Sequence, residues 1–218
     1  MITLNPFGRS KLGTVGKPLP GVEVQISPDG EVLTRGPHVM AGYYEDPGQS
    51  ALAFRDGWLL TGDLGKLDED GYLSITGRKK EILVTSGGKN VSPVNIEEAL
   101  RRSPLIQQVF VVGDGRKFIS ALIVPEWETL RSLVRSGKIP AGDGEELLQS
   151  NPVIDLYWQE IQKCQQGFSD YEKVKKFCFL DESALEDPEL ITPTQKLRRQ
   201  VLEAKCRSRI DRMYRTEY

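Results

Sequence analysis

The chain has 218 residues, enough for one large domain or two small ones. Its 29 Lys and Arg residues nearly balance 31 Asp and Glu residues, a formal net charge of −2, which excludes the overall basic excess of a nucleic-acid-binding protein. Hydrophobic residues make up 39% of the chain, which supports a buried core, and no apolar run reaches the roughly 20 residues needed to span a bilayer.

The first part of the chain is punctuated by glycine and proline and predicts a β-rich region. Residues 22–26 alternate with period two, residues 31–34 follow a Pro-Asp-Gly turn, and residues 72–75 follow an Asp-Gly turn. Ser92 and Pro93 then predict the start of a helix that runs over 94–102. Apolar runs at 108–112 and 118–124 predict a hairpin packed on that helix.

Beyond Pro125 the pattern becomes helical, and a strand is expected only at 174–180. Two apolar stripes at helical spacing predict core-facing helices: Ile154, Trp158, Ile161 and Cys164, then Leu202, Cys206, Ile210 and Met213. We expect an α+β chain with a small β-rich subdomain at 1–79 and an α+β domain at 80–218. The helical stretch at about 126–171 is expected to be an insertion in the second domain.

Two polar segments lie in the β-rich half. The run Trp58-Leu-Leu-Thr-Gly-Asp63 places a carboxylate between two glycines, where it could accept hydrogen bonds from the vicinal hydroxyls of a ribose or simply form a turn. Arg78, Lys79 and Lys80 close the following strand, and the planar donors of an arginine suit phosphate or ribose oxygens. A solvated basic turn is the alternative.

Two more segments lie in the second half. Gly87, Gly88 and Lys89 form a loop in which a backbone could approach a ligand closely, although neither a Walker nor a GxGxxG spacing is present. Lys196 ends a Thr-Pro-Thr-Gln-Lys loop before a helix, where it could neutralise developing negative charge or merely start the helix.

The residue types do not favour a Ser-His-Asp triad, a disulfide framework or a metal site. His38 is the single histidine, so a Ser-His-Asp triad is unavailable, and we expect a structural role for it. The three cysteines, Cys164, Cys178 and Cys206, are widely spaced, which favours neither a disulfide framework nor a metal site and suits a reducing cytoplasm.

The identity and order of these segments resemble the C-terminal part of the adenylate-forming superfamily, which comprises acyl-CoA synthetases, luciferases and nonribosomal adenylation domains. The matching motifs are Gly30-Glu31 with Gly42-Tyr43 and Pro47, Thr61-Gly62-Asp63, Gly77-Arg78 through Glu97-Glu98, and Lys196. Within the superfamily, Thr-Pro-Thr-x-Lys and the helical insertion are most similar to long-chain fatty acid–CoA ligases. Gln195 and Leu60 depart from residues that many members carry, glycine and arginine respectively.

The phosphate loop and adenine motif that members carry upstream do not occur in this sequence. We therefore expect a fragment: the last β-rich subdomain of the AMP-binding N-terminal domain, followed by the mobile C-terminal domain. The resemblance implies a full-length enzyme that activates a fatty acid with Mg-ATP to acyl-adenylate and transfers the acyl group to CoA. The fragment alone should be inactive, and its metal site should lie outside it.

The resemblance also implies residue roles. Asp63 would hold the ribose of ATP or AMP, Arg78 would assist at the ribose or phosphate, and Lys196 would be the catalytic lysine. Lys80 would be the hinge of the mobile domain, which swings between the two half-reactions. The loop of Gly87, Gly88 and Lys89 would then line the channel for CoA.

Three questions stay open at this stage. Another carboxylate activator, for aryl, short-chain or amino acids, would share these motifs, and a stand-alone binding module without catalysis would be compatible with a lone C-terminal domain. The surplus of basic residues after Lys196 offers either a peripheral contact with an anionic membrane or a solvated helix face. We expect a cytoplasmic protein with no nucleic-acid partner.

Overall fold

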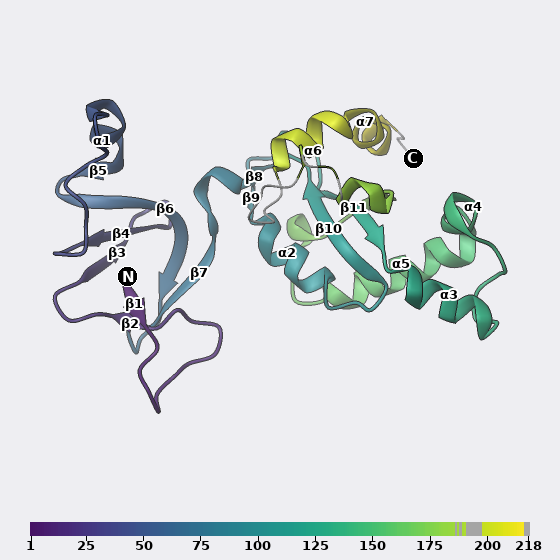
Figure 1. Cartoon of the computed structure of the whole chain (residues 1–218), viewed down its shortest axis with the longest axis horizontal. Helices are drawn as coiled ribbons and strands as arrows, with labels where there is room; N and C mark the ends of the chain where they lie inside the picture. Colours follow the sequence, from purple (N-terminus) through teal and green to yellow (C-terminus); the bar gives the residue numbers. More distant parts are fainter. Residues whose placement is uncertain (186, 188, 191–197, 216–218) are drawn as a thin grey trace. The chain divides into compact units, whose positions relative to one another are not determined.

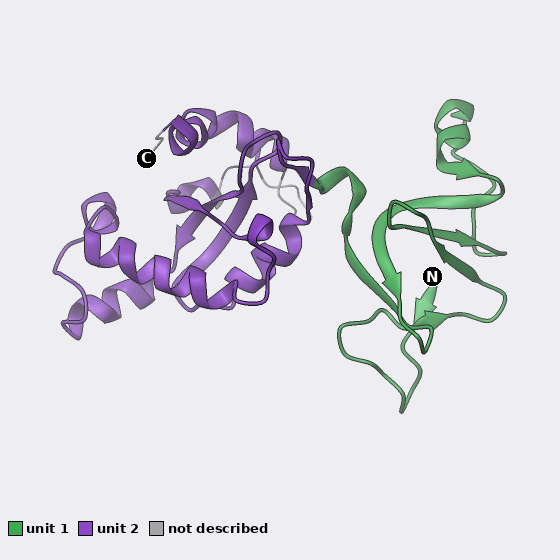
Figure 2. Ribbon diagram, turned by 180° about the vertical axis from the view of Figure 1, so that it is seen from behind, with its two compact units in different colours: residues 1–82 green, residues 83–218 purple. Residues whose placement is uncertain are grey.

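The computed structural model describes residues 1–185, 187, 189–190 and 198–215. The chain divides into two compact units, residues 1–82 and residues 83–218, which Figure 2 shows in different colours. Each unit has its own sheets and is described by itself. Among the described residues, none of the helices combines the length and the hydropathy that a membrane span requires.

Unit 1 is built around a five-stranded antiparallel sheet in which β4 and β6 pair at the centre and β7 pairs with β6. A two-stranded ribbon, one short α-helix and the 3₁₀ turn η1 (Lys79–Glu81) complete the unit (Figure 1). Its elements are β1 (Thr3–Leu4), β2 (Lys17–Pro18), β3 (Glu23–Ile26), β4 (Glu31–Arg35), α1 (Pro47–Ala53), β5 (Phe54–Arg55), β6 (Trp58–Leu67) and β7 (Leu73–Arg78).

The turn between β3 and β4 follows from its residues. Gly30 has a φ of 85°, a left-handed conformation that glycine adopts without steric cost. Ser27 and Glu31 close the turn through a hydrogen bond from Ser27 N to Glu31 O of 2.9 Å. β4 then buries four successive residues, of which Glu31 and Thr34 are polar and are hydrogen-bonded.

Unit 2 contains a three-stranded sheet in the order β10-β11-β12, in which β11 is antiparallel to β10 and parallel to β12. A small hairpin precedes it. The elements after Arg78 are η1 (Lys79–Glu81), β8 (Leu83–Val84), β9 (Asn90–Val91), α2 (Pro93–Leu100), β10 (Ile106–Val112), β11 (Ser120–Pro125), α3 (Trp127–Arg135), α4 (Gly144–Leu148), α5 (Asn151–Cys164), η2 (Asp170–Glu172), β12 (Lys176–Phe179), η3 (Glu182–Leu185), α6 (Arg199–Lys205) and α7 (Arg207–Arg215).

The strand β11 divides the core of unit 2 into two clusters by the alternation of its side chains. Ala121 and Ile123 pack with residues of α2 and α5 on one face of the sheet. Leu122 and Val124 pack with residues of α6 and α7 on the other face. All four are fully buried, so the sheet is covered on both sides (Figure 1).

The apolar stripe expected on α5 is confirmed at Ile161 and wrong at the positions before it. The buried residues of the helix are Val153, Tyr157 and Ile161, whereas Trp158 of the predicted stripe is only half-buried. Tyr157 is buried because its hydroxyl donates a 2.7 Å hydrogen bond to Leu105 O, which satisfies its polar end. Ile161 is therefore in the core, whereas Ile154, Trp158 and Cys164 lie at its margin.

The single C-terminal helix that the sequence suggested is two helices. α6 ends at Lys205 and α7 begins at Arg207, with Cys206 between them. Leu202, Ile210 and Met213 are buried against the sheet, as the spacing predicted, and Cys206 is half-buried.

Candidate functional site

Asp63 and Arg78 face each other across neighbouring strands of unit 1. They are register partners in the β6–β7 ladder, and Arg78 Nε lies 2.8 Å from Asp63 Oδ1. The Asp63 side chain is 29% exposed and the Arg78 side chain 62%. Asp63 lies within β6. The pair thus presents a partly exposed carboxylate beside a cation.

Glu31 holds the backbone next to Asp63 and Arg78, a role that the sequence did not reveal. Its side chain is only 6% exposed and accepts 2.9 Å and 2.8 Å hydrogen bonds from Gly62 N and Lys79 Nζ. Gly62 immediately precedes Asp63 in the chain, and Lys79 immediately follows Arg78. The buried carboxylate therefore ties together the two backbone segments that carry the pair.

Lys79 also reaches Asp29, at 2.7 Å. The hydrogen bond from Lys79 lowers the pKa of Asp29 to about 2, and the bonds to Asp29 and Glu31 raise the pKa of Lys79. Lys79 and Arg78 are consequently members of ion pairs. Both side chains also stay substantially exposed to solvent, at 62% for Arg78 and 45% for Lys79.

Thr61 shapes the strand just before Asp63. Its hydroxyl donates a 2.7 Å hydrogen bond to Val32 O and accepts a 3.1 Å bond from Asp63 N. The β4–β6 register shifts at this point, and Gly62 has a φ of 73°. The Thr-Gly-Asp run therefore forms an irregular strand segment that glycine makes accessible.

Lys80 lies in the short η1 turn and is exposed. The boundary between the two compact units falls after Ile82, two residues further along the chain. The residue expected to be a hinge is therefore next to the junction of the units.

Gly87 and Gly88 lie in the tight loop between β8 and β9. The loop is closed by hydrogen bonds from Thr85 N to Lys89 O at 3.0 Å and from Gly88 N to Thr85 O at 2.8 Å. Gly88 has a φ of 71°, and a Cβ built there meets no atom within 4 Å. Position 88 therefore favours glycine because of its left-handed backbone conformation, and not because a neighbouring atom would clash with a side chain. The space beside Gly88 is open. Lys89 extends to the ring of Tyr171, 5.7 Å from Nζ to the centroid.

A buried ion pair joins α2 to α6 in unit 2. Arg199 Nη2 donates to both carboxylate oxygens of Glu97, at 2.9 Å and 3.1 Å, and Arg199 Nη1 donates to Val111 O at 2.8 Å. Glu97 also accepts a 2.7 Å hydrogen bond from Val111 N. Burial raises the pKa of Glu97, while the charge of Arg199 opposes the rise. Lys196 lies outside the described residues, and Arg199 follows it by three positions.

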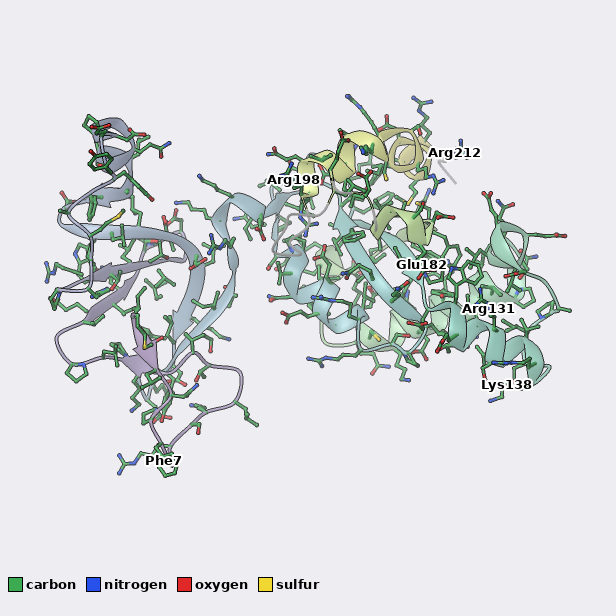
Figure 3. The ribbon with its side chains drawn as sticks, in the orientation of Figure 1. Phe7, Arg131, Lys138, Glu182, Arg198 and Arg212 are labelled. Carbon is green, nitrogen blue, oxygen red and sulfur yellow. The ribbon has the colours of Figure 1, made fainter. Side chains whose placement is uncertain are left out.

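The basic residues near the C-terminus are partly engaged within unit 2. Arg199 is held by Glu97, and Lys205 Nζ lies 2.6 Å from both Asp187 and Glu189. Figure 3 shows Arg198 at the start of α6 and Arg212 in α7, so the remaining cations are distributed along both helices. Carboxylates from earlier in the chain therefore offset part of the surplus of basic residues after Lys196.

Metal and thiol chemistry find no site in the described part of the chain. No group of three or more His, Cys, Asp or Glu side chains could hold a metal ion there. The three cysteines are free, and burial raises the pKa of Cys178 to about 11, so its thiol stays protonated at neutral pH.

Comparison with known proteins places these residues in context. The family model described as "AMP-binding enzyme C-terminal domain" matches residues 80–218. The long-chain-fatty-acid–CoA ligase FadD15 of Mycobacterium tuberculosis is 42% identical over 217 residues, which are 99% of this chain and 36% of that protein. The human long-chain-fatty-acid–CoA ligase 1 is 37% identical over 192 residues, 86% of this chain and 27% of that protein. The chain thus spans about a third of the length of these relatives.

Solved structures with the same fold are adenylate-forming enzymes. O-succinylbenzoate coenzyme A synthetase (MenE) from Bacillus subtilis in complex with AMP aligns with a TM-score of 0.63 and 27% identity over 90% of this chain and 36% of that chain. The anthranilate CoA ligase AuaEII in complex with anthranoyl-AMP aligns with a TM-score of 0.67 and 25% identity over 95% of this chain and 36% of that chain. The α+β fold expected from the sequence is confirmed by these similarities.

Proposed function

The chain belongs to the family of AMP-binding enzyme C-terminal domains, and from this premise we propose that it is the C-terminal part of a long-chain fatty acid–CoA ligase. The observation that carries the proposal is the 42% identity with such a ligase over 99% of the chain. The complete polypeptide would convert a fatty acid, Mg-ATP and CoA to acyl-CoA, AMP and pyrophosphate. Residues 1–79 would be the last subdomain of its N-terminal domain.

Asp63 and Arg78 would hold the nucleotide. The partly exposed carboxylate of Asp63 suits a ribose hydroxyl, which can donate to it, while the ion pair with Arg78 keeps the carboxylate oriented. The guanidinium of Arg78 is largely exposed, so it also has donors for a ribose or phosphate oxygen. Glu31 supports both residues through Gly62 and Lys79 and would act as a positioning residue.

Lys196 would act in the first half-reaction. As the carboxylate attacks the α-phosphate of ATP and pyrophosphate leaves, an ammonium bridging the two groups would offset the negative charge of the transition state. The clamp between Glu97 and Arg199 supports this role, because it fixes the start of α6 three residues after Lys196.

The second half-reaction would use the loop between β8 and β9. With Lys80 as the hinge, unit 2 would change its orientation so that Gly87, Gly88 and Lys89 line the path of the CoA thiol. The open outer side of the loop supports this role, because no side chain of the loop glycines obstructs a ligand. The thiol would then attack the acyl carbon and release AMP.

The relatives and the solved structures are named for different acyl substrates. The relatives from Mycobacterium tuberculosis and human are named as long-chain ligases, whereas the solved structures include enzymes named for o-succinylbenzoate and anthranilate. An aryl acid is therefore the second candidate, and the higher identity favours a long chain.

A chimaera tests the proposal. This chain would replace the aligned 36% of FadD15, and palmitoyl-CoA formation would be measured with palmitate, ATP and CoA, beside benzoate and acetate. We expect thioester formation that prefers palmitate, and none from the 218-residue chain alone. A folded chimaera that binds ATP but forms neither acyl-adenylate nor thioester would contradict the proposal, as would turnover by the isolated chain.

A further inference from the structure

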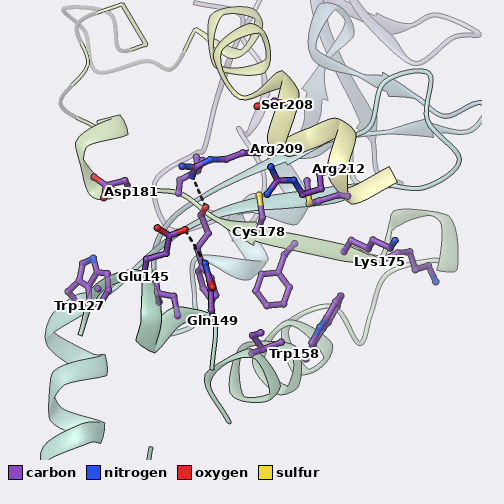
Figure 4. A pocket seen from close by; sticks show the side chains of 18 residues that line it. Trp127, Glu145, Gln149, Trp158, Lys175, Cys178, Asp181, Ser208, Arg209 and Arg212 are labelled. Carbon is purple, nitrogen blue, oxygen red and sulfur yellow. Dashed lines mark hydrogen bonds between the residues drawn. The ribbon is translucent and has the colours of Figure 1, made fainter. Parts of the chain in front are cut away.

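A groove of about 930 Å³ follows the outer edge of β12 in unit 2. We call it the edge groove and define it by Trp127, Trp158, Phe177, Phe179, Arg209 and Arg212, which all line it (Figure 4). Helices α4 and α5 border it on one side and α7 on the other. Its volume falls in the range of roughly 300–1,000 Å³ that is typical of sites for small molecules.

The edge groove is a different place from the candidate nucleotide and CoA residues. Asp63 and Arg78 belong to unit 1, whereas every residue that lines the groove belongs to unit 2. Within unit 2, α4 and the end of α7 lie on the side away from the β8–β9 hairpin in both views (Figures 1 and 2). The proposed catalytic cycle therefore leaves this groove without an assigned role.

One wall of the groove is aromatic. The rings of Trp158 and Phe177 are 5.0 Å apart and those of Phe177 and Phe179 are 5.3 Å apart, both edge to face. All three side chains are half-buried, although the sequence pattern placed Trp158 in the core. Exposed apolar area of this kind is unfavourable in water, and an alkyl chain lying on it would remove it from solvent.

The opposite wall is cationic. Arg209 and Arg212 are three residues apart on α7 and therefore project from the same side of the helix, toward β12 (Figure 4). Arg209 Nη1 donates a 3.2 Å hydrogen bond to Phe179 O, which fixes the guanidinium beside the aromatic wall. The charged lining residues are the cations Lys175, Lys176, Arg209 and Arg212 and the acids Glu145 and Asp181, so positive charge predominates.

The same hydrogen bond decides between two kinds of occupant. Leu180 N donates to Ile123 O at 2.8 Å, so by the alternation of a parallel ladder Phe179 directs its backbone groups to the outer edge. An added peptide strand would need Phe179 O, which already accepts from Arg209. Arg209 therefore competes with an added strand at this edge, while a flexible chain without backbone donors meets no such competition.

We propose that the edge groove binds an anionic amphiphile, with its alkyl chain on the aromatic wall and its carboxylate or phosphate head at Arg209 and Arg212. A guanidinium pair on one side of a helix can bind either head through charge-assisted hydrogen bonds. The ligand is a single dispersed molecule and not a bilayer, because the apolar wall is recessed between helices of the same unit.

The tryptophans of the chain provide the test. The chain has three tryptophans, of which Trp127 and Trp158 line the groove, so Trp58→Phe leaves only groove reporters. The 218-residue chain with this substitution is titrated with dispersed 9,10-dibromostearate, whose bromines quench tryptophan. We expect saturable quenching at one ligand per chain. A brominated lysophosphatidate in a parallel titration tells whether carboxylate or phosphate is the better head.

Charge variants give the decisive comparison. Arg209→Gln and Arg212→Gln should each weaken binding on the order of tenfold, the effect of losing a charge-assisted hydrogen bond. Arg207→Gln, on the same helix but outside the edge groove, is the matched control and should leave the affinity unchanged. The uncharged methyl ester should bind about as weakly as the arginine variants.

Four results would overturn the proposal: no saturable quenching, equal losses for Arg207→Gln and Arg209→Gln, equal affinity for the methyl ester, or quenching seen only when the lipid is in anionic phosphatidylglycerol vesicles. Far-ultraviolet circular dichroism of each variant shows whether it is folded, and because Arg212→Gln leaves the hydrogen bond from Arg209 to Phe179 in place, it tests the head site without disturbing β12.

Discussion

The two units of the chain are stabilised in different ways. In unit 1 the buried hydrophobic side chains are only Val32, Leu33, Tyr72 and Leu73, and its candidate site consists of ion pairs that are partly exposed. Unit 2 has two apolar clusters on the two faces of its sheet, and its principal ion pair is buried. Strand pairing and charges therefore organise unit 1, and apolar burial organises unit 2.

This difference indicates where each kind of function can be located. The proposed nucleotide site suits a unit with a thin core, because its charged groups stay accessible to ligand and water. The proposed reorientation of unit 2 as a body would need the larger core, which keeps its loops in place. The tryptophans separate the two, since Trp58 belongs to unit 1 and Trp127 and Trp158 to unit 2.

The largest effect is expected from Ile123→Ala in β11. Ile123 is fully buried in the cluster against α2 and α5, so its truncation should lower the free energy of unfolding of unit 2 by about 4 kcal/mol. Urea denaturation followed by Trp127 and Trp158 in a Trp58→Phe background measures it. An equal shift of the Trp58 transition, measured with both other tryptophans replaced by Phe, would mean that the units do not unfold separately.

Glu97→Ala comes next. It would leave Arg199 and Val111 N without their acceptor in a buried place, which should cost unit 2 about 3 kcal/mol. Glu97→Gln should cost less, because an amide oxygen can still accept from Val111 N. The exposed neighbour Glu98→Ala is the control. If Glu97→Ala and Glu98→Ala have the same midpoint in urea, the ion pair between Glu97 and Arg199 does not contribute to the stability of unit 2.

Lys79→Ala should have a smaller effect and act on unit 1. It removes the cation from Glu31, which is nearly buried, and from Asp29, which is exposed, so we expect a loss of about 1 kcal/mol on the Trp58 transition. Lys80→Ala, for an exposed lysine in the same turn, should leave the transition in place. If Lys79→Ala and Lys80→Ala lower the free energy of unfolding of unit 1 equally, the supporting role assigned to Glu31 is contradicted.

The smallest effect is a dependence on pH. Asp29 has a folded pKa of about 2 against an ordinary value of 3.8, so its contribution to stability is present above pH 4 and is lost as the pH falls through 2. In Asp29→Asn, the urea midpoint reported by Trp58 should therefore depend less on pH between pH 4 and pH 2 than in the unsubstituted chain. An unchanged pH profile in the variant would show that the pair with Lys79 does not stabilise the fold.

Much of the local structure could be predicted from the sequence because local signals determine it. The Pro-Asp-Gly turn before β4, the Ser92-Pro93 start of α2 and the β10–β11 hairpin all agree with the structure. Each depends on turn chemistry or on alternation over a few residues. These signals need no knowledge of distant partners.

The supporting residues could not be predicted because their partners are distant in the chain. Glu31 meets Lys79 across 48 positions, and Glu97 meets Arg199 across 102. In the sequence Glu97 and Glu98 look alike, and only the helical phase beside Ile96 and Leu100 separates them. The stripe on α5 was wrong at Trp158 for a related reason, since hydropathy favours Trp158 over Tyr157, whose hydroxyl is satisfied only in the fold.

The central claim is that the two units divide the work, with nucleotide binding on unit 1 in both half-reactions and the lysine of unit 2 acting in one. The most direct test is Lys196→Ala in the chimaera with FadD15, with the two half-reactions measured separately. We predict that palmitoyl-adenylate formation falls at least about 100-fold, as for the loss of an electrostatic catalytic group, while CoA thioester formation from supplied palmitoyl-adenylate changes by less than about threefold. Equal losses in both half-reactions would contradict the account.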